Sequence, residues 1–331
     1  MRAMVLHGQA PIETHPLRSE DLPVPSPGGD ELLVRVRACG ICRTDLHIVE
    51  GDLPPARARI VPGHQVVGVV ETASAGGRFA RGERVGMAWL RRTCGRCEYC
   101  ASGRENLCER AEFTGWHADG GFAEFAVVPA AFAYAIPAVF ADVEAAPLLC
   151  AGIIGFRALE RAAVPPDGRL GLWGFGSSAH VTLQISRARG ARVYVFTREP
   201  SHRDLAKALG AVWTGDLGDA PPEPLHSAIV FAPIGDLVPL ALRRLARGGT
   251  LALAGIYMTP TPPLEYARDL FYERQVRSVT ANTRADGEAL LAEAAGIPVR
   301  LTTTTFALSD ANRALAALKR GAFSGSGVLV S

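Results

Sequence analysis

The sequence predicts an α/β protein with two domains: an irregular, barrel-like β domain and a doubly wound parallel sheet. Three observations lead to this prediction. The chain has 331 residues, more than one hydrophobic core usually serves. Short apolar strands fill its first half, whereas strand and helix patterns alternate from Ala151 onward. Short strands return after about residue 277, so we expect residues 1–150 and 278–331 to form the β domain and residues 151–277 the parallel-sheet domain.

Alternating apolar residues mark the strands of the first half. In Glu31–Ala38 the residues Leu32, Val34 and Val36 fall on one face, as in a half-buried strand. A stretch of prolines and glycines precedes this strand and predicts a turn before it. Two further strands are expected at Val66–Thr72 and Phe122–Val128. Short strands separated by such turns are typical of a folded β domain.

The second half has the spacing of parallel βαβ units, with helices on both faces of the sheet. The proline pair Pro165–Pro166 ends the first expected helix. We expect helices at Ile153–Ala163 and Ser178–Arg189, and strands at Arg169–Trp173, Arg192–Thr197, Ala228–Phe231 and Thr250–Ile256. After about residue 277 we expect one helix, Asp310–Lys319.

Composition and charge argue against several classes of protein. The chain is 48% hydrophobic and 21% charged, with a formal net charge of +2. These values are ordinary for a globular protein, and the chain has no basic block of the kind that binds nucleic acid. No apolar run reaches the roughly 18 residues of a membrane span, and the N-terminus lacks the apolar core of a secretory signal. We expect a cytoplasmic protein without a nucleic-acid or membrane partner.

Four of the seven cysteines lie close together in the sequence. Cys94, Cys97, Cys100 and Cys108 have the spacing C-x2-C-x2-C-x7-C in a polar segment. Four thiolates at this spacing can close a tetrahedral zinc shell, and the metal would then supply the folding energy that an apolar core supplies elsewhere. Free or disulfide-bonded cysteines and an iron–sulfur cluster are the alternatives. A closed zinc site of this kind stabilises the protein but does not catalyse.

A glycine-rich turn follows the strand expected at Arg169–Trp173 and opens a helix. Gly174 and Gly176 match the first two glycines of a dinucleotide-binding fingerprint, and Ala179 takes the place of the third. Gly174 permits the tight turn, Gly176 lets a diphosphate approach the backbone, and the helix N-terminus at Ser177 attracts the anion. An ordinary glycine turn is the alternative.

The remaining metal-ligand candidates are dispersed. Cys39, Cys42, His64 and Cys150 lie far apart in the sequence, so spacing alone does not bring them together. Taken singly, a cysteine is more often a small buried apolar residue. A lone histidine near a strand is more often a hydrogen-bonded core residue.

Several motifs, all in the same order, resemble those of one family. They are Cys39–Asp52 (CGICRTDLHIVEGD), Pro62–Gly68 (PGHQVVG), Gly82–Gly86 (GERVG), the four-cysteine segment and Pro147–Leu159 (PLLCAGIIGFRAL). Over nearly its whole length the chain resembles the zinc-containing alcohol dehydrogenases of the medium-chain dehydrogenase/reductase superfamily. The resemblance implies a GroES-like catalytic domain and a Rossmann coenzyme domain. It also implies two zinc ions per chain and reversible hydride transfer between a primary or secondary alcohol and NAD(P).

The resemblance assigns roles around the first zinc. Cys42, His64 and Cys150 are implied to be its ligands, with the fourth place left for water or substrate. Asp45 is implied to orient His64. Cys39 falls outside the ligand positions, and we expect it to pack in the core.

Two residues are implied to move the proton that an alcohol loses on oxidation. Thr44 takes this proton, the cofactor ribose passes it on, and His47 delivers it to solvent. An imidazole suits the last step because its pKa lies near physiological pH. Capping of a loop is the alternative role for Thr44, and simple surface exposure for His47.

The chain departs from the family at two places. The residue after the ligand histidine is usually glutamate, whereas this chain has the neutral Gln65. Many relatives carry an arginine near the final strand that contacts the diphosphate, and the stretch from Gly325 (GSGVL) lacks it. We expect activity to survive the first departure, and another group to neutralise the diphosphate or the cofactor to bind more weakly.

The end of the second parallel strand bears on the choice of cofactor. An NAD enzyme usually has a carboxylate there, whereas this chain has Thr197 followed by Arg198, with Arg203 a turn later. A missing acid with arginines nearby favours a 2′-phosphate and therefore NADP over NAD. Glu199 argues against this choice, because its carboxylate would repel a phosphate.

The expected function is zinc-dependent alcohol dehydrogenase activity in a homodimer or homotetramer. An alternative with the same chemistry is an NADPH-dependent aldehyde reductase acting on aromatic or aliphatic aldehydes. Trp89 and Trp116 are candidate walls of its pocket, although core packing explains them equally well. A non-enzymatic zinc protein is the alternative from another class, and the Thr44 and His47 pair argues against it.

Overall fold

The structure is a computed structural model that describes residues 1–74 and 77–331. The chain divides into two compact units. The first contains Met1–Cys150, Ala281–Ala295 and Leu301–Ser331, and the second contains Ala151–Thr280 and Gly296–Arg300. Residues 296–300 therefore belong to the unit with the parallel sheet, although they were expected to belong to the β domain.

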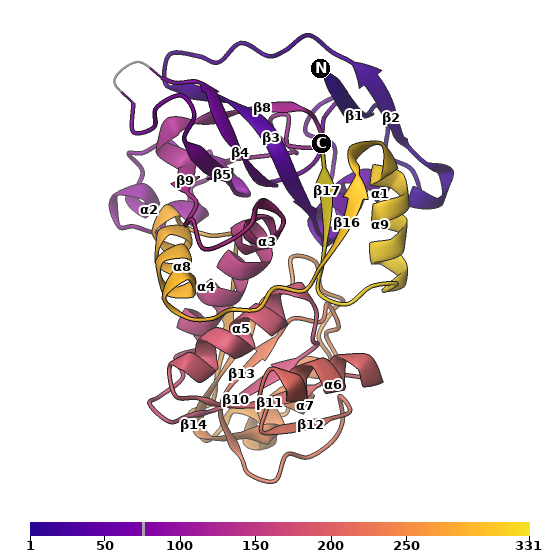
Figure 1. Cartoon of the computed structure of the whole chain (residues 1–331). Coiled ribbons are helices and arrows are strands. Elements are labelled where there is room, and N and C mark those ends of the chain that lie inside the picture. The colour runs from indigo at the N-terminus through magenta and orange to yellow at the C-terminus, as the bar shows by residue number, and fades with distance from the viewer. Residues whose placement is uncertain (75–76) are drawn as a thin grey trace. The chain divides into compact units, whose positions relative to one another are not determined.

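A mainly antiparallel sheet is the centre of the first unit. Its long strand β3 pairs with β4, β8 and β17, so the C-terminal strand lies beside an N-terminal one (Figure 1). Within the described residues the sheet has 7 strands: β3 (Glu31–Ile41), β4 (Gln65–Thr72), β5 (Arg84–Met87), β8 (Phe125–Pro129), β9 (Ala133–Ala135), β16 (Thr303–Ala307) and β17 (Ser326–Val330). The predicted apolar face of β3 is buried, because Leu32, Val34 and Val36 are at most 4% exposed.

Short helices and two ribbons complete the first unit. The ribbons pair β1 (Arg2–Leu6) with β2 (Leu17–Asp21) and β6 (Leu90–Arg92) with β7 (Glu112–Phe113). The helices are α1 (Arg43–Glu50), α2 (Glu98–Ala101), α3 (Asp142–Pro147), α8 (Arg284–Gly296) and α9 (Ala311–Arg320). The expectation of a single helix after residue 277 was wrong, because α8 precedes α9. The buried residues of α8 (Gly287, Leu290, Leu291 and Ala294) fall on one face at helical spacing, but exposed alanines on the other faces obscure this pattern in the sequence.

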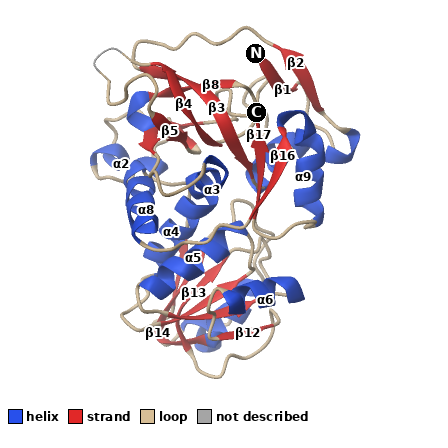
Figure 2. Ribbon diagram, in the orientation of Figure 1, coloured by secondary structure: helices blue, strands red, loops and turns tan. Residues whose placement is uncertain are grey.

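The second unit is a parallel sheet of 6 strands in the order β12-β11-β10-β13-β14-β15. The strands are β10 (Arg169–Trp173), β11 (Arg192–Phe196), β12 (Trp213–Gly215), β13 (Leu225–Val230), β14 (Leu245–Leu253) and β15 (Gln275–Ser278). The order reverses after β10, and with right-handed crossovers this reversal puts the connecting helices on opposite faces. Figure 2 shows the helices packed along the strands: α4 (Ile153–Ala162), α5 (Ser177–Ala188), α6 (Pro200–Ala208) and α7 (Leu237–Arg244). The predicted α/β class with a doubly wound sheet is confirmed.

None of the helices in the described ranges is long and apolar enough to cross a membrane.

Candidate active site

Cys42, His64 and Cys150 meet in the first unit although they are distant in sequence. Their ligand atoms all lie within 4.8 Å of one another, and Cys42 Sγ is 3.3 Å from His64 Nε2. Each comes from a different element. Cys42 is the N-cap of α1, His64 directly precedes β4, and Cys150 lies on a π-helical turn, Leu148–Gly152. Such single π-turns are frequent at functional sites.

The carboxylate of Asp45 fixes two of these residues. Its Oδ1 lies 3.0 Å from His64 Nδ1 and accepts a hydrogen bond from the Gly63 amide at 3.2 Å. Its Oδ2 accepts one from the Cys42 amide at 2.9 Å. Both His64 and Asp45 are fully buried. Because Nδ1 of His64 is engaged by Asp45, its Nε2 is the atom turned toward the two thiols.

A glycine before the histidine makes this approach possible. Gly63 has φ +98°, which favours glycine, and a Cβ on it would come within 2.4 Å of the Phe122 ring and 2.9 Å of Cys39 Sγ. Cys39 is buried at this contact and, as expected, lies outside the cluster of ligand atoms. Close packing thus holds the backbone that presents His64.

The three ligand candidates have strongly shifted pKa values. A hydrogen bond with Cys150 lowers the pKa of Cys42 well below its ordinary value, and the same contact raises that of Cys150. Burial acts to lower the pKa of His64, but the charges of Asp45 and Cys42 outweigh burial and raise it to about 10. His64 and Cys150 therefore carry protons at neutral pH, and a metal cation that binds here must displace them.

Thr44 and His47 lie on the same side of α1, three residues apart. Thr44 is buried, and its amide donates to Cys42 Sγ at 3.2 Å. His47 is partly exposed, with Nδ1 at 2.7 Å from Asp52 Oδ2. The helix therefore runs from a buried hydroxyl beside the thiol to an imidazole near solvent.

An aromatic stack borders the cluster. The Trp89 ring meets His64 edge-on, with centroids 5.0 Å apart. Trp89 stacks on Phe113 and Trp116, and Trp116 Nε1 donates to the Pro54 carbonyl at 2.9 Å. Trp89 is 7% exposed, so much of its ring is used in packing.

Gln65 opens β4 opposite Gly40 and is 1% exposed. Within the described residues its Nε2 atom has no hydrogen-bond partner. Its neutral side chain is thus buried directly after His64, where the family usually has a carboxylate.

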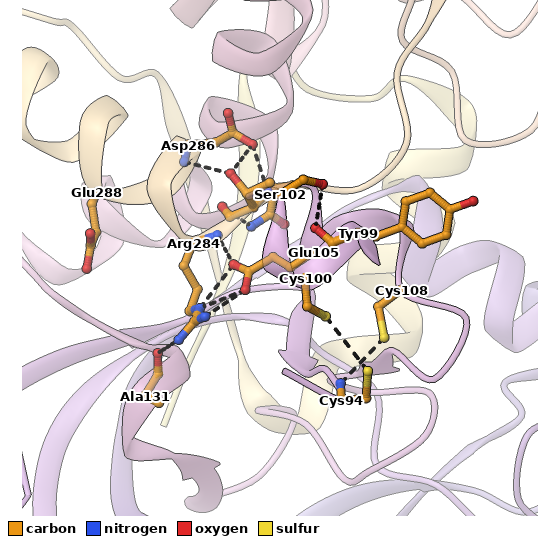
Figure 3. Close-up of polar contacts among 12 residues, drawn as sticks. Cys94, Tyr99, Cys100, Ser102, Glu105, Cys108, Ala131, Arg284, Asp286 and Glu288 are labelled. Atoms are coloured by element: carbon orange, nitrogen blue, oxygen red, sulfur yellow. Dashed lines mark hydrogen bonds and ion pairs between the residues drawn. The ribbon is translucent and has the colours of Figure 1, made fainter. Parts of the chain in front are cut away.

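The four clustered cysteines form a second site in the first unit, which we call the cysteine lobe (residues 94–108). The ligand atoms of Cys94, Cys97, Cys100 and Cys108 lie within 4.8 Å of one another. Figure 3 shows Cys94 Sγ facing Cys100 Sγ at 3.9 Å and the Cys94 amide directed at Cys108 Sγ at 3.4 Å. The lobe helix α2 buries none of its residues. Four converging soft donors in a segment without an apolar core fit a structural zinc site.

The glycine turn of the second unit has the geometry of a dinucleotide site. Gly174 has φ +86°, and a Cβ on it would lie 3.1 Å from the Ala232 amide. Gly176 faces open space, since a Cβ there would meet nothing within 4 Å. Helix α5 begins at the next residue, Ser177, so its first amides point to this opening. The open space at Gly176 is where a diphosphate could approach the backbone.

The arginines beyond β11 differ in their surroundings. Arg203 Nε donates to the Thr197 carbonyl at 2.8 Å, and its Nη2 lies 3.2 Å from Asp216 Oδ2. Arg203 thus holds the loop and already faces a carboxylate. Thr197 is buried, whereas Arg198 and Glu199 are exposed. Arg198 is the arginine that offers its charge to solvent here.

A doubly wound sheet with this glycine turn, joined in one chain to a Cys–His–Cys cluster, defines the class of dinucleotide-dependent oxidoreductases. A family model described as "Alcohol dehydrogenase GroES-like domain" matches residues 28–138. The chain is 54% identical to "Probable alcohol dehydrogenase AdhA" of Mycobacterium tuberculosis, over 100% of this chain and 97% of the relative.

Solved structures agree. A thermostable alcohol dehydrogenase from Pyrobaculum aerophilum with cobalt and zinc bound has a TM-score of 0.90 and 27% identity, over 100% of this chain and 99% of that one. A cinnamyl alcohol dehydrogenase from Sorghum bicolor has a TM-score of 0.89 and 27% identity, over 99% and 97% of the two chains. The chain belongs to the alcohol dehydrogenase family with a GroES-like domain. It is an enzyme, an oxidoreductase that acts on small alcohols and their carbonyl products.

Sequence reasoning missed two features of the site. The π-helical turn at Cys150 has no signal in the sequence, because a π-turn differs from an α-helix by a single residue. Arg284 was also missed; it contacts the cysteine lobe from a helix that had not been predicted. The acidic Glu105 inside the lobe is the sequence feature that could have indicated a basic partner for the lobe.

Proposed function

We propose that this alcohol dehydrogenase holds two zinc ions per chain with different tasks. The catalytic zinc would be held by Cys42, His64 and Cys150, and the structural zinc by the four cysteines of the lobe. The observation that carries the proposal is the convergence of both sets of ligand atoms to within 4.8 Å. Three donors leave a tetrahedral ion one open position for substrate, whereas four donors leave none.

When bound, the catalytic zinc supplies a Lewis acid, which makes an alcohol easier to deprotonate and a carbonyl easier to reduce. The protein's residues orient that centre and handle the proton. Asp45 holds the His64 ring with Nε2 toward the thiols. Thr44 would accept the alcohol's proton at its hydroxyl oxygen while its own hydroxyl proton leaves toward the cofactor ribose. His47 would take the proton on from the ribose and release it to solvent. The partly exposed position of His47 supports this role.

NADP is the proposed cofactor in preference to NAD. It would bind at the turn formed by Gly174, Gly176 and Ser177, with the 2′-phosphate near Thr197. Arg198 carries most of this preference, because it is exposed while Arg203 already pairs with Asp216. The neutral Thr197 stands where an NAD enzyme usually has a carboxylate, and the exposed Glu199, two residues later, is the acidic side chain that acts against this preference.

Reduction of aromatic aldehydes is a second candidate for the physiological reaction. The stack of Trp89, Phe113 and Trp116 beside His64 supports it, because aromatic rings favour stacked or edge-to-face neighbours. The similarity to a cinnamyl alcohol dehydrogenase supports the same choice. A non-enzymatic zinc protein is not favoured, since the chain belongs to a family of enzymes.

Assembly into a homodimer, or a homotetramer built from dimers, is proposed through the second unit. Six apolar residues of the second unit, which we name together the aromatic surface, are each 38–66% exposed: Ile256, Tyr257, Tyr266, Phe271, Tyr272 and Val276. The aromatic surface includes β15, an edge strand of the sheet. An edge strand with exposed apolar neighbours can pair with its own copy across a two-fold axis. A cytoplasmic location is proposed because none of the seven cysteines, all of them within the described residues, forms a disulfide, as is usual in reducing compartments.

The test is an activity matrix of cofactors and substrates on zinc-loaded enzyme. NADPH and NADP should be used with a lower KM than NADH and NAD, across aliphatic and aromatic aldehydes and alcohols. Arg198→Ala should raise the KM for NADPH more than that for NADH. A preference for NAD that Arg198→Ala leaves unchanged would contradict the cofactor proposal. Inactivity with every combination of cofactor and substrate would contradict the assigned reaction.

A further inference from the structure

An acidic residue of the cysteine lobe, Glu105, is hydrogen-bonded to the first residue of α8. Glu105 lies in the short 3-10 helix Glu105–Leu107, between Cys100 and Cys108. Its carboxylate accepts hydrogen bonds from Arg284, the first residue of α8, although the two are 179 positions apart in the sequence. Figure 3 shows this contact beside the cysteines.

The contact between Glu105 and Arg284 is two-pronged and includes the helix backbone. Arg284 Nη2 donates to Oε2 at 2.7 Å, and Nε donates to Oε1 at 3.0 Å. The Arg284 amide also donates to Oε1 at 2.8 Å. The carboxylate therefore satisfies one of the unpaired amides at the start of α8 and faces the positive end of the helix dipole.

This pair is built into the protein rather than lying loosely on its surface. The side chain of Glu105 is only 9% exposed, and the guanidinium of Arg284 also stacks over the Phe132 ring at 4.6 Å. Burial acts to raise the pKa of Glu105, but the hydrogen bonds from Arg284 outweigh burial and lower it. The carboxylate is therefore charged, and removal of Arg284, whose own side chain is 42% exposed, would leave this buried charge poorly compensated.

The backbone of Glu105 contacts the lobe at the same time. The Glu105 carbonyl accepts a hydrogen bond from the amide of Cys108 at 3.0 Å. One residue thus holds the amide of a ligand candidate with its backbone and the start of α8 with its side chain. Glu105 therefore takes part both in the conformation of the lobe and in the docking of α8.

We propose that Glu105 is a positioning residue that links zinc occupancy of the cysteine lobe to the docking of α8. The proposal rests on the structural zinc proposed above. A metal that fixes Cys100 and Cys108 fixes Glu105 between them, and Glu105 then holds the N-terminus of α8. Linkage is reciprocal in affinity, so a docked α8 must also tighten the binding of zinc by the lobe. With an unchanged association rate, tighter binding is measured as slower loss of zinc.

The test compares Glu105→Gln with a matched control on the same helix. Glu288 of α8 pairs with Arg78 at 2.9 Å on the surface, with both side chains about half exposed. Glu288→Gln therefore removes an exposed ion pair of α8 and leaves the hydrogen bonds between Arg284 and Glu105 in place. Zinc release from the loaded enzyme to a coloured chelator, 4-(2-pyridylazo)resorcinol, is followed together with amide hydrogen exchange in residues 284–296. Loss of activity, recorded in parallel, identifies the zinc that leaves the catalytic cluster.

Glu105→Gln should release the lobe zinc at least about fivefold faster, the lower end of typical couplings between sites. It should also speed exchange in α8, and zinc removal should speed that exchange in the wild type. Glu288→Gln should leave the zinc release rate unchanged. Arg284→Lys keeps the positive charge but cannot make the two-pronged hydrogen bond, so it should give an intermediate rate of zinc release. This variant replaces Glu105→Gln in the test if Glu105→Gln does not fold.

Two results would overturn the linkage. The first is an unchanged rate of lobe zinc release in Glu105→Gln, or in Arg284→Lys where that variant replaces it. The second is exchange in α8 that does not respond to zinc removal. Either result, in a wild type that holds two zinc ions, would leave the proposed function standing. A wild type without zinc in the lobe would overturn both proposals.

Discussion

Asp45 shows how a single buried carboxylate can assemble a site from distant parts of the chain. Its two oxygens hold the Cys42 amide, the Gly63 amide and the His64 ring. Cys42 and His64 are thereby brought to 3.3 Å between Sγ and Nε2. Full burial of both His64 and Asp45 keeps water from competing for these bonds.

Replacement of one ligand in each cluster should separate the two tasks. Cys42→Ser should abolish activity and leave the thermal midpoint nearly unchanged, because its helix and carboxylate contacts remain. Cys97→Ser should lower the thermal midpoint by about 5 °C or more, since the lobe has no apolar core to replace a metal. Thermal melts and steady-state rates check both outcomes. If the two variants changed activity and thermal midpoint in the same way, the division into a catalytic and a structural zinc site would be contradicted.

Zinc binding at the first cluster should release protons at neutral pH. The raised pKa of Cys150 and the His64 pKa of about 10 mean that both groups are protonated in the metal-free enzyme at pH 7. Bound zinc needs both groups deprotonated, so the apparent affinity should rise with pH and fall as the pH drops. Calorimetry of Cys97→Ser in buffers of different ionisation enthalpy should report about two protons per zinc. A heat of binding independent of the buffer would be the contrary result.

The two clusters differ in how far sequence could predict them. Cys94, Cys97, Cys100 and Cys108 are close in sequence, so their spacing alone indicates a common site. Cys42, His64 and Cys150 could be grouped only by resemblance to a family. Their proximity depends on β-sheet register and on Asp45, and neither leaves a local pattern in the sequence.

The glycine turn between β10 and α5 offers a paired test at the scale of the element. Gly174→Ala should destabilise the protein by about 1–2 kcal/mol, because a non-glycine residue is strained at φ +86°. Gly176→Ala should leave stability unchanged, since its Cβ would meet nothing within 4 Å. The same Cβ would stand where the diphosphate approaches, so the Kd for NADPH should rise. Thermal melts and fluorescence titrations measure the two effects. A loss of stability in Gly176→Ala, with the rise in Kd found in Gly174→Ala instead, would refute the proposed role of the turn.

Helices were predictable where an apolar stripe or a stop signal marked them. Ile153–Ala163 was expected, and α4 spans Ile153–Ala162. α8 was missed because its alanines and leucines show no clear stripe. That helix is defined by its caps and contacts, such as Asp286, which accepts from the amide and hydroxyl of Thr283 at 2.7 Å. That cap is local, between residues three apart, and is a feature the sequence does carry, whereas the contact of Arg284 with Glu105 forms only once the first unit is folded.

At the scale of the whole molecule, the fold class followed from the order of patterns along the chain. Parallel βαβ units are local in sequence, so the doubly wound sheet could be predicted. The return of the C-terminal strands to the first domain was expected because short strand patterns reappear near the end of the chain. The pairing of β17 with β3, with Leu329 opposite Cys39, could not be read from sequence because it joins the two ends of the chain.

The oligomeric state should depend on the aromatic surface of the second unit. Phe271→Glu, at a residue 57% exposed, should shift the protein to a smaller species, because a charge buried in an apolar interface is costly. Val139→Glu is the control, at an apolar residue of the first unit that is somewhat more exposed (65%). Light scattering after size exclusion reports the mass. A wild-type monomer, or an unchanged mass in Phe271→Glu, would exclude this surface as the interface.

The two-zinc account is tested most directly by anomalous diffraction at the zinc edge from crystals of the enzyme. The account predicts two peaks per chain. One should lie among Cys42 Sγ, His64 Nε2 and Cys150 Sγ, and the other among the four sulfurs of the lobe. A single peak, or a peak away from either cluster, would contradict the claim that this enzyme holds two zinc ions with different tasks.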